Sequence, residues 1–336
     1  MKNIINKIKY LTEISKLHYN EVELEFNKYV EKYNFYGLYK IKNSKTTHLF
    51  NNMHSIFFYS IYESLGFTEC ERKFCGILNN CLRLIITGAD NLLDGDDNHY
   101  LSYTKITKSK IMKSVFDLLL AEKIICSVLY NYSHTHNLFR HEKITEIQSE
   151  IFKQLTGSGI NEAEETQLTQ LNFSPEKIIS SVHHYKSGKL FTLPFIAAKN
   201  INKNPNLLKT ESAIYDFGIA VQLLDDISDI YEDFTEKKPN YILALMVRDN
   251  ILKKSETVLS DLKSNSKNLY SNPVIMRYID ESMITISEKI HSAFSELYSI
   301  NNKYDQTFLN CIMKLIFTKL KIGMLYSKFI KKLAVD

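Results

Sequence analysis

The stretch Val221-Gln-Leu-Leu-Asp-Asp-Ile-Ser-Asp229 carries the strongest signal in this chain of 336 residues. It lies in an apolar segment that is expected to be helical from about residue 213. On a helix, Asp225 and Asp229 lie one turn apart and Gln222 lies three residues before Asp225, so the three side chains share one face. Asp226 is offset by about 100°.

Carboxylates stacked in this way repel one another unless a cation lies between them. Hard oxygen ligands suit Mg²⁺, which keeps some of its waters and bridges to phosphate groups. The alternative interpretation is a solvated acidic face. The stretch favours a cavity instead, because apolar residues flank the aspartates on both sides, namely Leu223, Leu224, Ile227 and Ile230.

A second acidic cluster lies earlier, in Arg83-Leu-Ile-Ile-Thr-Gly-Ala-Asp90-Asn-Leu-Leu-Asp94-Gly-Asp-Asp97. Asp90 and Asp94 are again one helical turn apart, and Arg83 falls on the same face two turns earlier. Asp96 and Asp97 follow Gly95 and fit either an exposed turn or a functional role. Two carboxylate pairs, each at the end of an apolar helix, can hold several Mg²⁺ ions around a diphosphate and stabilise charge on a leaving group.

Two lysine-bearing segments accompany the aspartates. Tyr185-Lys186-Ser-Gly-Lys189 lies before them, and Lys237-Lys238-Pro-Asn follows them. A lysine followed by Ser187 and a glycine lets a helix bend and brings an ammonium group and a hydroxyl near an anion. Each segment alone is weak evidence, because solvated lysines are common.

Composition predicts an all-α protein. Glycine (10 residues) and proline (5) are few, and apolar residues recur at intervals of three and four through most of the chain. No stretch reads as a linker, so we expect one large helical bundle over residues 1–336. Breaks between helices are predicted at residues 42–45, 95–99, 130–136, 157–165, 199–205, 235–240 and 264–273. Ser174 is expected to cap a helix that has Pro175 in its first turn.

The charge pattern excludes a dedicated nucleic-acid surface. The 42 Lys and Arg against 38 Asp and Glu give a formal charge of +4, spread along the chain. The lysine-rich N-terminus lacks the apolar block of a secretory signal, and no segment approaches the ~20 apolar residues of a membrane span. Five cysteines without a CxxC pair indicate reduced thiols and a cytoplasmic protein.

Together these motifs, over roughly residues 80–245, resemble the trans-polyprenyl diphosphate synthase family of the class I isoprenoid (terpene) synthase superfamily. The later cluster is similar to its FQxxDDxxD motif, with Val221 in place of Phe, which implies Asp225, Asp226 and Asp229 as metal ligands. The earlier cluster is similar to its DDxxD motif, with Asn91 in place of the second Asp. In that family the counterparts of Lys186-Ser187 and Lys238 contact diphosphate.

Two departures bear on the acceptor substrate. Family members that elongate chains carry an Arg-Arg pair after the first aspartate motif, where this chain has His99 and Tyr100. They also carry a Gly-Gly-Lys-Arg element that grips isopentenyl diphosphate, and the region around Tyr36-Gly-Leu-Tyr-Lys has none. Lysine and histidine replace the bidentate contacts of arginine poorly.

The resemblance therefore implies a Mg²⁺-dependent enzyme with a prenyl diphosphate substrate. Asp90, Asp94, Asp225, Asp226 and Asp229 are the expected catalytic residues, and all but Asp226 the expected metal ligands. The expected diphosphate-binding residues are Arg83, Lys186, Ser187, Gln222 and Lys238. The preferred function is a terpene synthase, a lyase that ionises an allylic diphosphate and cyclises or deprotonates the cation. The alternatives are a prenyltransferase that uses isopentenyl diphosphate and a non-catalytic partner subunit, and a homodimer stays open.

Overall fold

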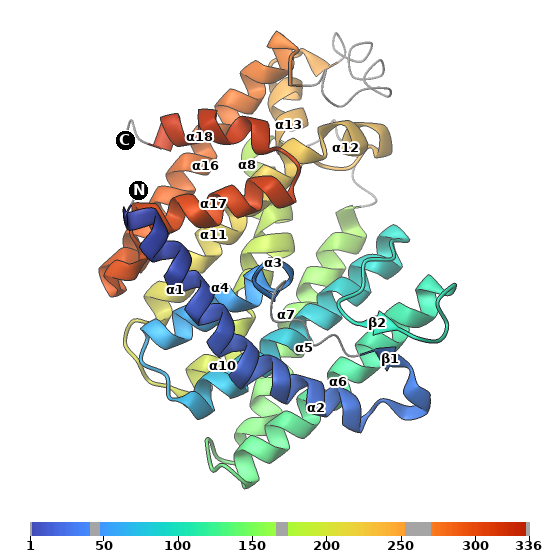
Figure 1. The fold of residues 1–336 in the computed structure, drawn as a ribbon. Coiled ribbons are helices and arrows are strands. Elements are labelled where there is room, and N and C mark those ends of the chain that lie inside the picture. Colours follow the sequence, from blue (N-terminus) through green and yellow to red (C-terminus); the bar gives the residue numbers. More distant parts are fainter. Residues whose placement is uncertain (1, 41–47, 166–173, 253–269, 334–336) are drawn as a thin grey trace. The chain divides into compact units, whose positions relative to one another are not determined.

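The computed structural model describes residues 2–40, 48–165, 174–252 and 270–333, and almost all of them are helical (Figure 1). The prediction of an all-α fold is confirmed. The chain divides into two compact units. Unit 1 comprises residues 1–150 and 193–207, and unit 2 comprises residues 151–192 and 208–336. The prediction of one domain over the whole chain stays a prediction.

Unit 1 is built around a pair of long helices, α5 (Glu69–Asp94) and α6 (Lys110–His134), which lie side by side (Figure 1). A capping box between Thr68 and Glu71 starts α5, and Gly95 in the left-handed conformation (φ 71°) ends it. The break predicted at residues 95–99 is confirmed. The helix therefore carries Asp90 and Asp94 to its C-terminal end.

Shorter helices complete this unit. They are α1 (Lys2–His18), the π-helical turn η1 (Tyr19–Glu23), α2 (Leu24–Lys32), the 3₁₀ turn η2 (Phe35–Gly37), α3 (His48–Asn51), α4 (Met53–Ser64), the start of α7 (Lys143–Glu165) and α10 (Pro194–Ile201). Two short strands, β1 (Tyr39–Lys40) and β2 (Ser102–Tyr103), pair antiparallel with Tyr39 opposite Tyr103. No other strand occurs in the described residues.

Unit 2 surrounds α11 (Leu207–Ser228), the helix with the later aspartates. Phe217 of α11 packs edge-on against Phe294 of α16 (Pro273–Ile300), with ring centres 5.7 Å apart. The other elements are α8 (Pro175–Lys177), the π-helical η4 (Ile178–Lys189), α9 (Leu190–Thr192), α12 (Ile230–Glu236), α13 (Tyr241–Arg248), η6 (Asn302–Tyr304), α17 (Gln306–Lys319), η7 (Gly323–Leu325) and α18 (Tyr326–Leu333).

Most predicted boundaries agree with the structure. Ser174 accepts the N–H of Lys177 and Pro175 begins α8, so the predicted cap is confirmed. The breaks at 199–205 and 235–240 are also confirmed, because α10 ends at Ile201 and α12 at Glu236. The break predicted at 42–45 lies outside the described residues, as do residues 264–269 of the break predicted at 264–273. The described end of the latter agrees with the structure, because α16 begins at Pro273. No helix in the described ranges is both long enough and apolar enough to cross a membrane.

The break predicted at 130–136 is confirmed, because α6 ends at His134. The break predicted at 157–165 is wrong, because helix α7 runs through these residues. A glycine costs a helix only about 1 kcal/mol, and tertiary packing offsets that cost. In α7 the buried hydroxyl of Ser158, between Gly157 and Gly159, donates to the carbonyl of Tyr185 in η4. This contact holds the glycine-flanked turn in helical form.

Candidate functional site

The later aspartates form a regular stack across the junction of α11 and α12. The N–H of Asp229 donates to the carbonyl of Asp225 at 3.0 Å, and the N–H of Asp233 donates to that of Asp229 at 2.9 Å. Each carboxylate thus lies one turn from the next, as predicted for the first two. The sequence reasoning missed Asp233, although its spacing of four from Asp229 is a signal that could have found it.

These side chains line a small cavity of unit 2, with a volume of about 40 Å³. Six of the predicted site residues lie on its wall, namely Lys186, Gln222, Asp225, Asp226, Asp229 and Lys238, together with Val182, His183, Asp233 and Pro239. A seventh, Ser187, donates a hydrogen bond to Oε1 of Gln222 at 2.7 Å. The structure therefore brings together residues that are up to 52 positions apart in the sequence (186 to 238).

The carboxylates in this cavity are electrostatically crowded. Burial, with the charges of Asp229 and Asp226, raises the pKa of Asp225 to about 6. Burial and the charge of Asp226 also raise the pKa of Asp229. The pKa of Asp233 rises to about 8, again mainly through burial and Asp226. The raised pKa values mean that burial and mutual repulsion disfavour the ionised carboxylates, and a bound cation would offset this cost, so the donor set fits a hard divalent ion such as Mg²⁺.

Asp226 differs from its neighbours because it points into the protein. It is buried, accepts the backbone N–H of Tyr241 at 2.7 Å and lies 3.0 Å from Nε2 of His183. Asn240 adds a second link, since its Nδ2 donates to the carbonyl of Asp226 and to the carboxylate of Asp233, each at 2.8 Å. These contacts indicate a positioning role that fixes α13 to the end of α11. Its assignment as a catalytic residue stays a prediction.

The lysine-bearing segment approaches α11 through a glycine. Lys186, Ser187 and Gly188 lie in the widened, π-helical η4. A Cβ on Gly188 would lie 2.4 Å from a ring carbon of Tyr215 in α11, so only glycine fits at this distance. The close approach brings Ser187 within reach of Gln222 and places Lys186 on the cavity wall.

The earlier cluster belongs to unit 1. Asp90 and Asp94 are exposed on the last turns of α5, whereas Asn91 between them is buried. Asn91 donates to the carbonyl of Asn98 at 3.0 Å and accepts its N–H at 3.2 Å. It therefore closes the loop after the helix. The joint binding of metal by the two aspartate clusters stays a prediction, because the clusters lie in different units.

Arg83 and the two residues in place of the arginine pair are engaged inside unit 1. Arg83 donates to Oδ1 of Asn52 and to the carbonyl of Asn51, both at 2.9 Å, and its guanidinium lies over the ring of Tyr100. Nδ1 of His99 lies 2.7 Å from the carboxylate of Asp117. The hydroxyl of Tyr100 donates to Glu23 at 3.0 Å. The predicted diphosphate contact of Arg83 stays a prediction.

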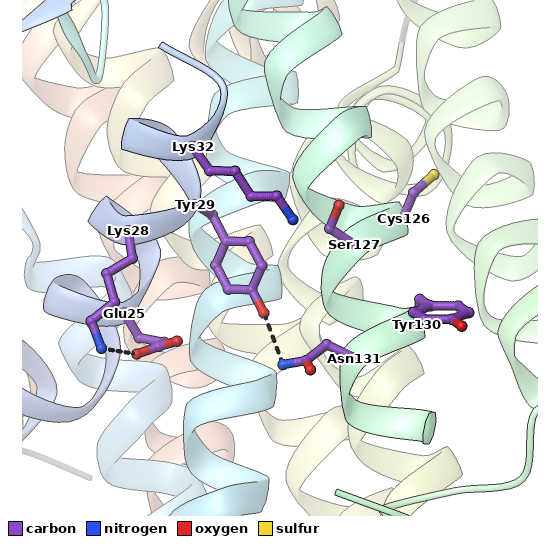
Figure 2. A pocket seen from close by; sticks show the side chains of 8 residues that line it. All are labelled: Glu25, Lys28, Tyr29, Lys32, Cys126, Ser127, Tyr130 and Asn131. Carbon is purple, nitrogen blue, oxygen red and sulfur yellow. Dashed lines mark hydrogen bonds and ion pairs between the residues drawn. The ribbon is translucent and has the colours of Figure 1, made fainter. Parts of the chain in front are cut away.

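A wider groove of unit 1, about 490 Å³ in volume, lies between α2 and α6 and is shown in Figure 2. Its polar groups are largely paired within the groove. Lys28 forms an ion pair with Glu25 at 2.8 Å, and the amide of Asn131 donates to the hydroxyl of Tyr29 at 3.2 Å. None of the predicted site residues lines this groove, so the cavity in unit 2 is the better candidate for the chemistry.

The raised pKa of Asp233 gives a pH-dependent prediction for the metal-free protein. The folded state holds this proton more tightly than the unfolded chain, so the stability that it contributes is lost as the pH rises from about 4 to about 8. Asp233→Asn should therefore stabilise the protein relative to wild type, by an amount that grows across this range by at most about 1.4 kcal/mol per pH unit. Denaturant unfolding with a chelator at several pH values measures the difference. A constant difference would contradict the prediction.

Comparison with known proteins identifies structures with a similar fold. No protein-family profile and no curated sequence matches the chain. Among solved structures, heptaprenyl diphosphate synthase from Staphylococcus aureus aligns with a TM-score of 0.57 at 13% identity, covering 93% of this chain and 98% of that one. Polyprenyl synthetase from Streptomyces coelicolor A3(2) aligns with a TM-score of 0.60 at 11% identity, covering 90% and 99%.

A third similar structure is that of polyprenyl synthase from Caulobacter crescentus CB15, complexed with calcium and isoprenyl diphosphate. It has a TM-score of 0.58 at 10% identity and covers 93% of this chain and 97% of that one. Identities this low establish the fold alone. The chain therefore has the all-helical fold of the polyprenyl diphosphate synthases, and the resemblance predicted from the motifs is confirmed at the level of the fold.

Proposed function

We propose that this chain is a metal-dependent enzyme that breaks the carbon–oxygen bond of an allylic prenyl diphosphate and transfers the prenyl group to an acceptor. The observation that carries the proposal is the cavity of unit 2, where three stacked carboxylates and two lysines converge. Carboxylates without a cation would repel a diphosphate. Lysines, in turn, could bind a diphosphate without any carboxylate beside them, so the lysines do not explain the three carboxylates. The combination fits an anion that is bound partly through divalent cations.

Asp225 and Asp229 are the proposed Mg²⁺ ligands in unit 2, with Asp233 as an additional candidate. When bound, the ions would neutralise negative charge on the departing diphosphate. Lys186 and Lys238 bind diphosphate oxygens electrostatically in this proposal. Oε1 of Gln222 accepts a hydrogen bond from the hydroxyl of Ser187 and so orients it. Nε2 of Gln222 donates to Asp225 at 3.2 Å, which keeps that carboxylate in place.

Prenyl transfer is preferred over cyclisation because of the comparisons. The solved structures with this fold that are described above are all named as prenyl diphosphate or polyprenyl synthases. The prenyltransferase therefore becomes the first candidate, in place of the terpene synthase that the sequence favoured. The acceptor is proposed to be isopentenyl diphosphate, and the assembly of two copies into a homodimer stays a prediction.

The terpene synthase remains a second candidate, and one observation favours it. His99 and Tyr100 occupy the positions of the arginine pair and are held by Asp117 and Glu23 inside unit 1. Side chains engaged in this way offer little to a second diphosphate, and each missing charge-assisted contact costs roughly 1.5–3 kcal/mol. A non-catalytic partner subunit is a third and weaker candidate, because the aspartates at 225 and 229 are retained.

The test is an assay of the purified chain with Mg²⁺ and prenyl diphosphates of increasing length, with and without isopentenyl diphosphate. We expect a longer prenyl diphosphate only when isopentenyl diphosphate is present, with inorganic diphosphate released in step. A hydrocarbon or alcohol formed from the allylic substrate alone would favour the terpene synthase. No diphosphate release under any of these conditions would overturn both enzyme proposals. Mass spectrometry of the products distinguishes the three outcomes.

A further inference from the structure

A compact group of three metal-ligating side chains lies in unit 1, outside the aspartate clusters. It consists of His18 at the end of α1, Glu23 at the end of η1 and His48 at the start of α3. All three are buried, and one ligand atom of each lies within 4.8 Å of the others. Buried histidines and carboxylates rarely converge from separate elements without a shared partner.

The backbone is shaped so that two of these residues meet. His18 and Glu23 are five positions apart, and on an ordinary α-helix they would point about 140° away from each other. The chain instead forms the π-helical turn η1, in which the N–H of Leu24 donates to the carbonyl of Tyr19. Such widened turns align residues five apart and occur frequently at functional sites. The turn therefore brings the carboxylate of Glu23 onto the same side as the ring of His18.

The hydrogen bonds of the cluster leave it incompletely satisfied. Nδ1 of His18 lies 2.9 Å from Nε2 of His48, so the two rings share one proton. Nε2 of His18 is buried and finds no hydrogen-bond partner in the described part of the chain. Burial lowers the pKa of both rings, that of His48 to about 4, which keeps them in the neutral form that binds metals.

Glu23 has the outer contacts expected of a carboxylate ligand. Its Oε2 accepts hydrogen bonds from the hydroxyl of Tyr100 at 3.0 Å and from the amide of Asn80 at 3.3 Å. His48 is likewise oriented, since the Nδ2 amide of Asn52, whose Oδ1 accepts from Arg83, donates to its Nδ1 at 2.9 Å. This donor leaves the proton of His48 on Nε2 in the metal-free cluster, so for Nε2 to bind a metal the proton must move to Nδ1 and the amide of Asn52 must turn to accept it. Partners of this kind fix the direction of metal ligands and are a regular part of metal sites.

We propose that His18, Glu23 and His48 bind one transition-metal ion of the zinc class and that this ion joins the α1–η1 segment to α3. Two imidazoles and one carboxylate are a common ligand set for Zn²⁺, and a water completes four-coordination. The ion takes the place of the proton shared by the two rings. Tetrahedral Zn²⁺ needs ligand nitrogens about 3.3 Å apart, so the rings must separate by only a few tenths of an ångström.

The positive charge of Arg83 should weaken binding of the ion, and this effect can be tested. Its positive charge acts on both histidines and on Glu23 and is held nearby by Asn52 and the ring of Tyr100. A buried cation beside a guanidinium is less stable than one without it. Arg83→Gln should therefore bind Zn²⁺ more tightly than wild type, whereas Glu23→Gln should bind it more weakly.

The experiment uses the full chain, stripped of metal with a chelator and titrated with Zn²⁺ by calorimetry and with Co²⁺ by visible absorption. We expect one equivalent to bind with the intense spectrum of tetrahedral Co²⁺, and about 100-fold or greater loss of affinity in His48→Ala and in the isosteric Glu23→Gln. His141→Ala, which removes an exposed histidine of the same unit, should bind as wild type does.

To exclude the aspartate cavity as the site that binds Co²⁺, the titration is repeated in the double variant Asp225→Asn/Asp229→Asn. The Co²⁺ spectrum should persist in this variant whether or not the enzyme proposal holds. Circular dichroism checks that each variant folds. The proposal is overturned if wild type binds no stoichiometric Zn²⁺, or if Glu23→Gln and His48→Ala, both folded, bind it as tightly as His141→Ala does.

Discussion

Asp225→Asn and Asp229→Asn should each lower turnover of an allylic diphosphate by at least about 100-fold, because each removes a charged ligand from the proposed metal site. The two carboxylates lie one turn apart and face the same cavity as Lys186 and Lys238. Asparagine keeps the size and one oxygen but not the charge. The loss should therefore appear in the rate at saturating Mg²⁺ and in a higher Mg²⁺ requirement, both measured by diphosphate release.

Folding serves as the internal control for this prediction. Asp225 carries a pKa raised to about 6 by burial and by its acidic neighbours, so removal of its charge should not destabilise the metal-free protein near neutral pH. Asp216→Asn is the matched variant, since Asp216 lies on the same helix, pairs with Lys289 at 2.7 Å and does not line the cavity. Asp216→Asn should retain turnover. Near wild-type turnover in both cavity variants would contradict the metal-ligand assignment.

Local patterns in the sequence predicted the parts of the site that depend on neighbouring residues. The four-residue spacing of Asp225 and Asp229 is a property of one helical turn, and the Ser174-Pro175 start is decided within four residues. The pairing of Ser187 with Gln222 is different, because it joins segments 35 residues apart. Only the family resemblance, which fixes the order of whole motifs, could indicate that these segments share a site.

Features that depend on tertiary contacts were missed. Asp225 and Asp226 both line the cavity, and the helix geometry predicted their different directions, but the acceptor role of Asp226 toward the backbone N–H of Tyr241 could not be predicted. Glycines 157 and 159 predicted a break where packing of Ser158 maintains a helix. A π-helical turn brings the side chains of His18 and Glu23 together, and no simple residue pattern predicts such a turn. In each case a long-range contact overrides the local preference.

Asp226→Ala should lower the free energy of unfolding by about 3 kcal/mol, a larger effect than any other single change considered in unit 2. The carboxylate is 4% exposed and serves two partners, the N–H of Tyr241 at 2.7 Å and the ring of His183 at 3.0 Å. Its removal leaves a buried donor at the start of α13 without an acceptor. The end of α11 and the start of α13 should then separate more easily.

Asp225→Ala is the matched control, because it makes the same truncation one residue earlier on the cavity side. It should leave stability unchanged or raised in the presence of a chelator, since it removes a charge from a crowded acidic site. Chemical denaturation of both variants without metal measures the contrast. His183→Ala combined with Asp226→Ala should cost less than the sum of the two single changes, because the residues share one contact. Equal stabilities for the two alanine variants would show that Asp226 does not fix α13, and would return it to the set of candidate metal ligands.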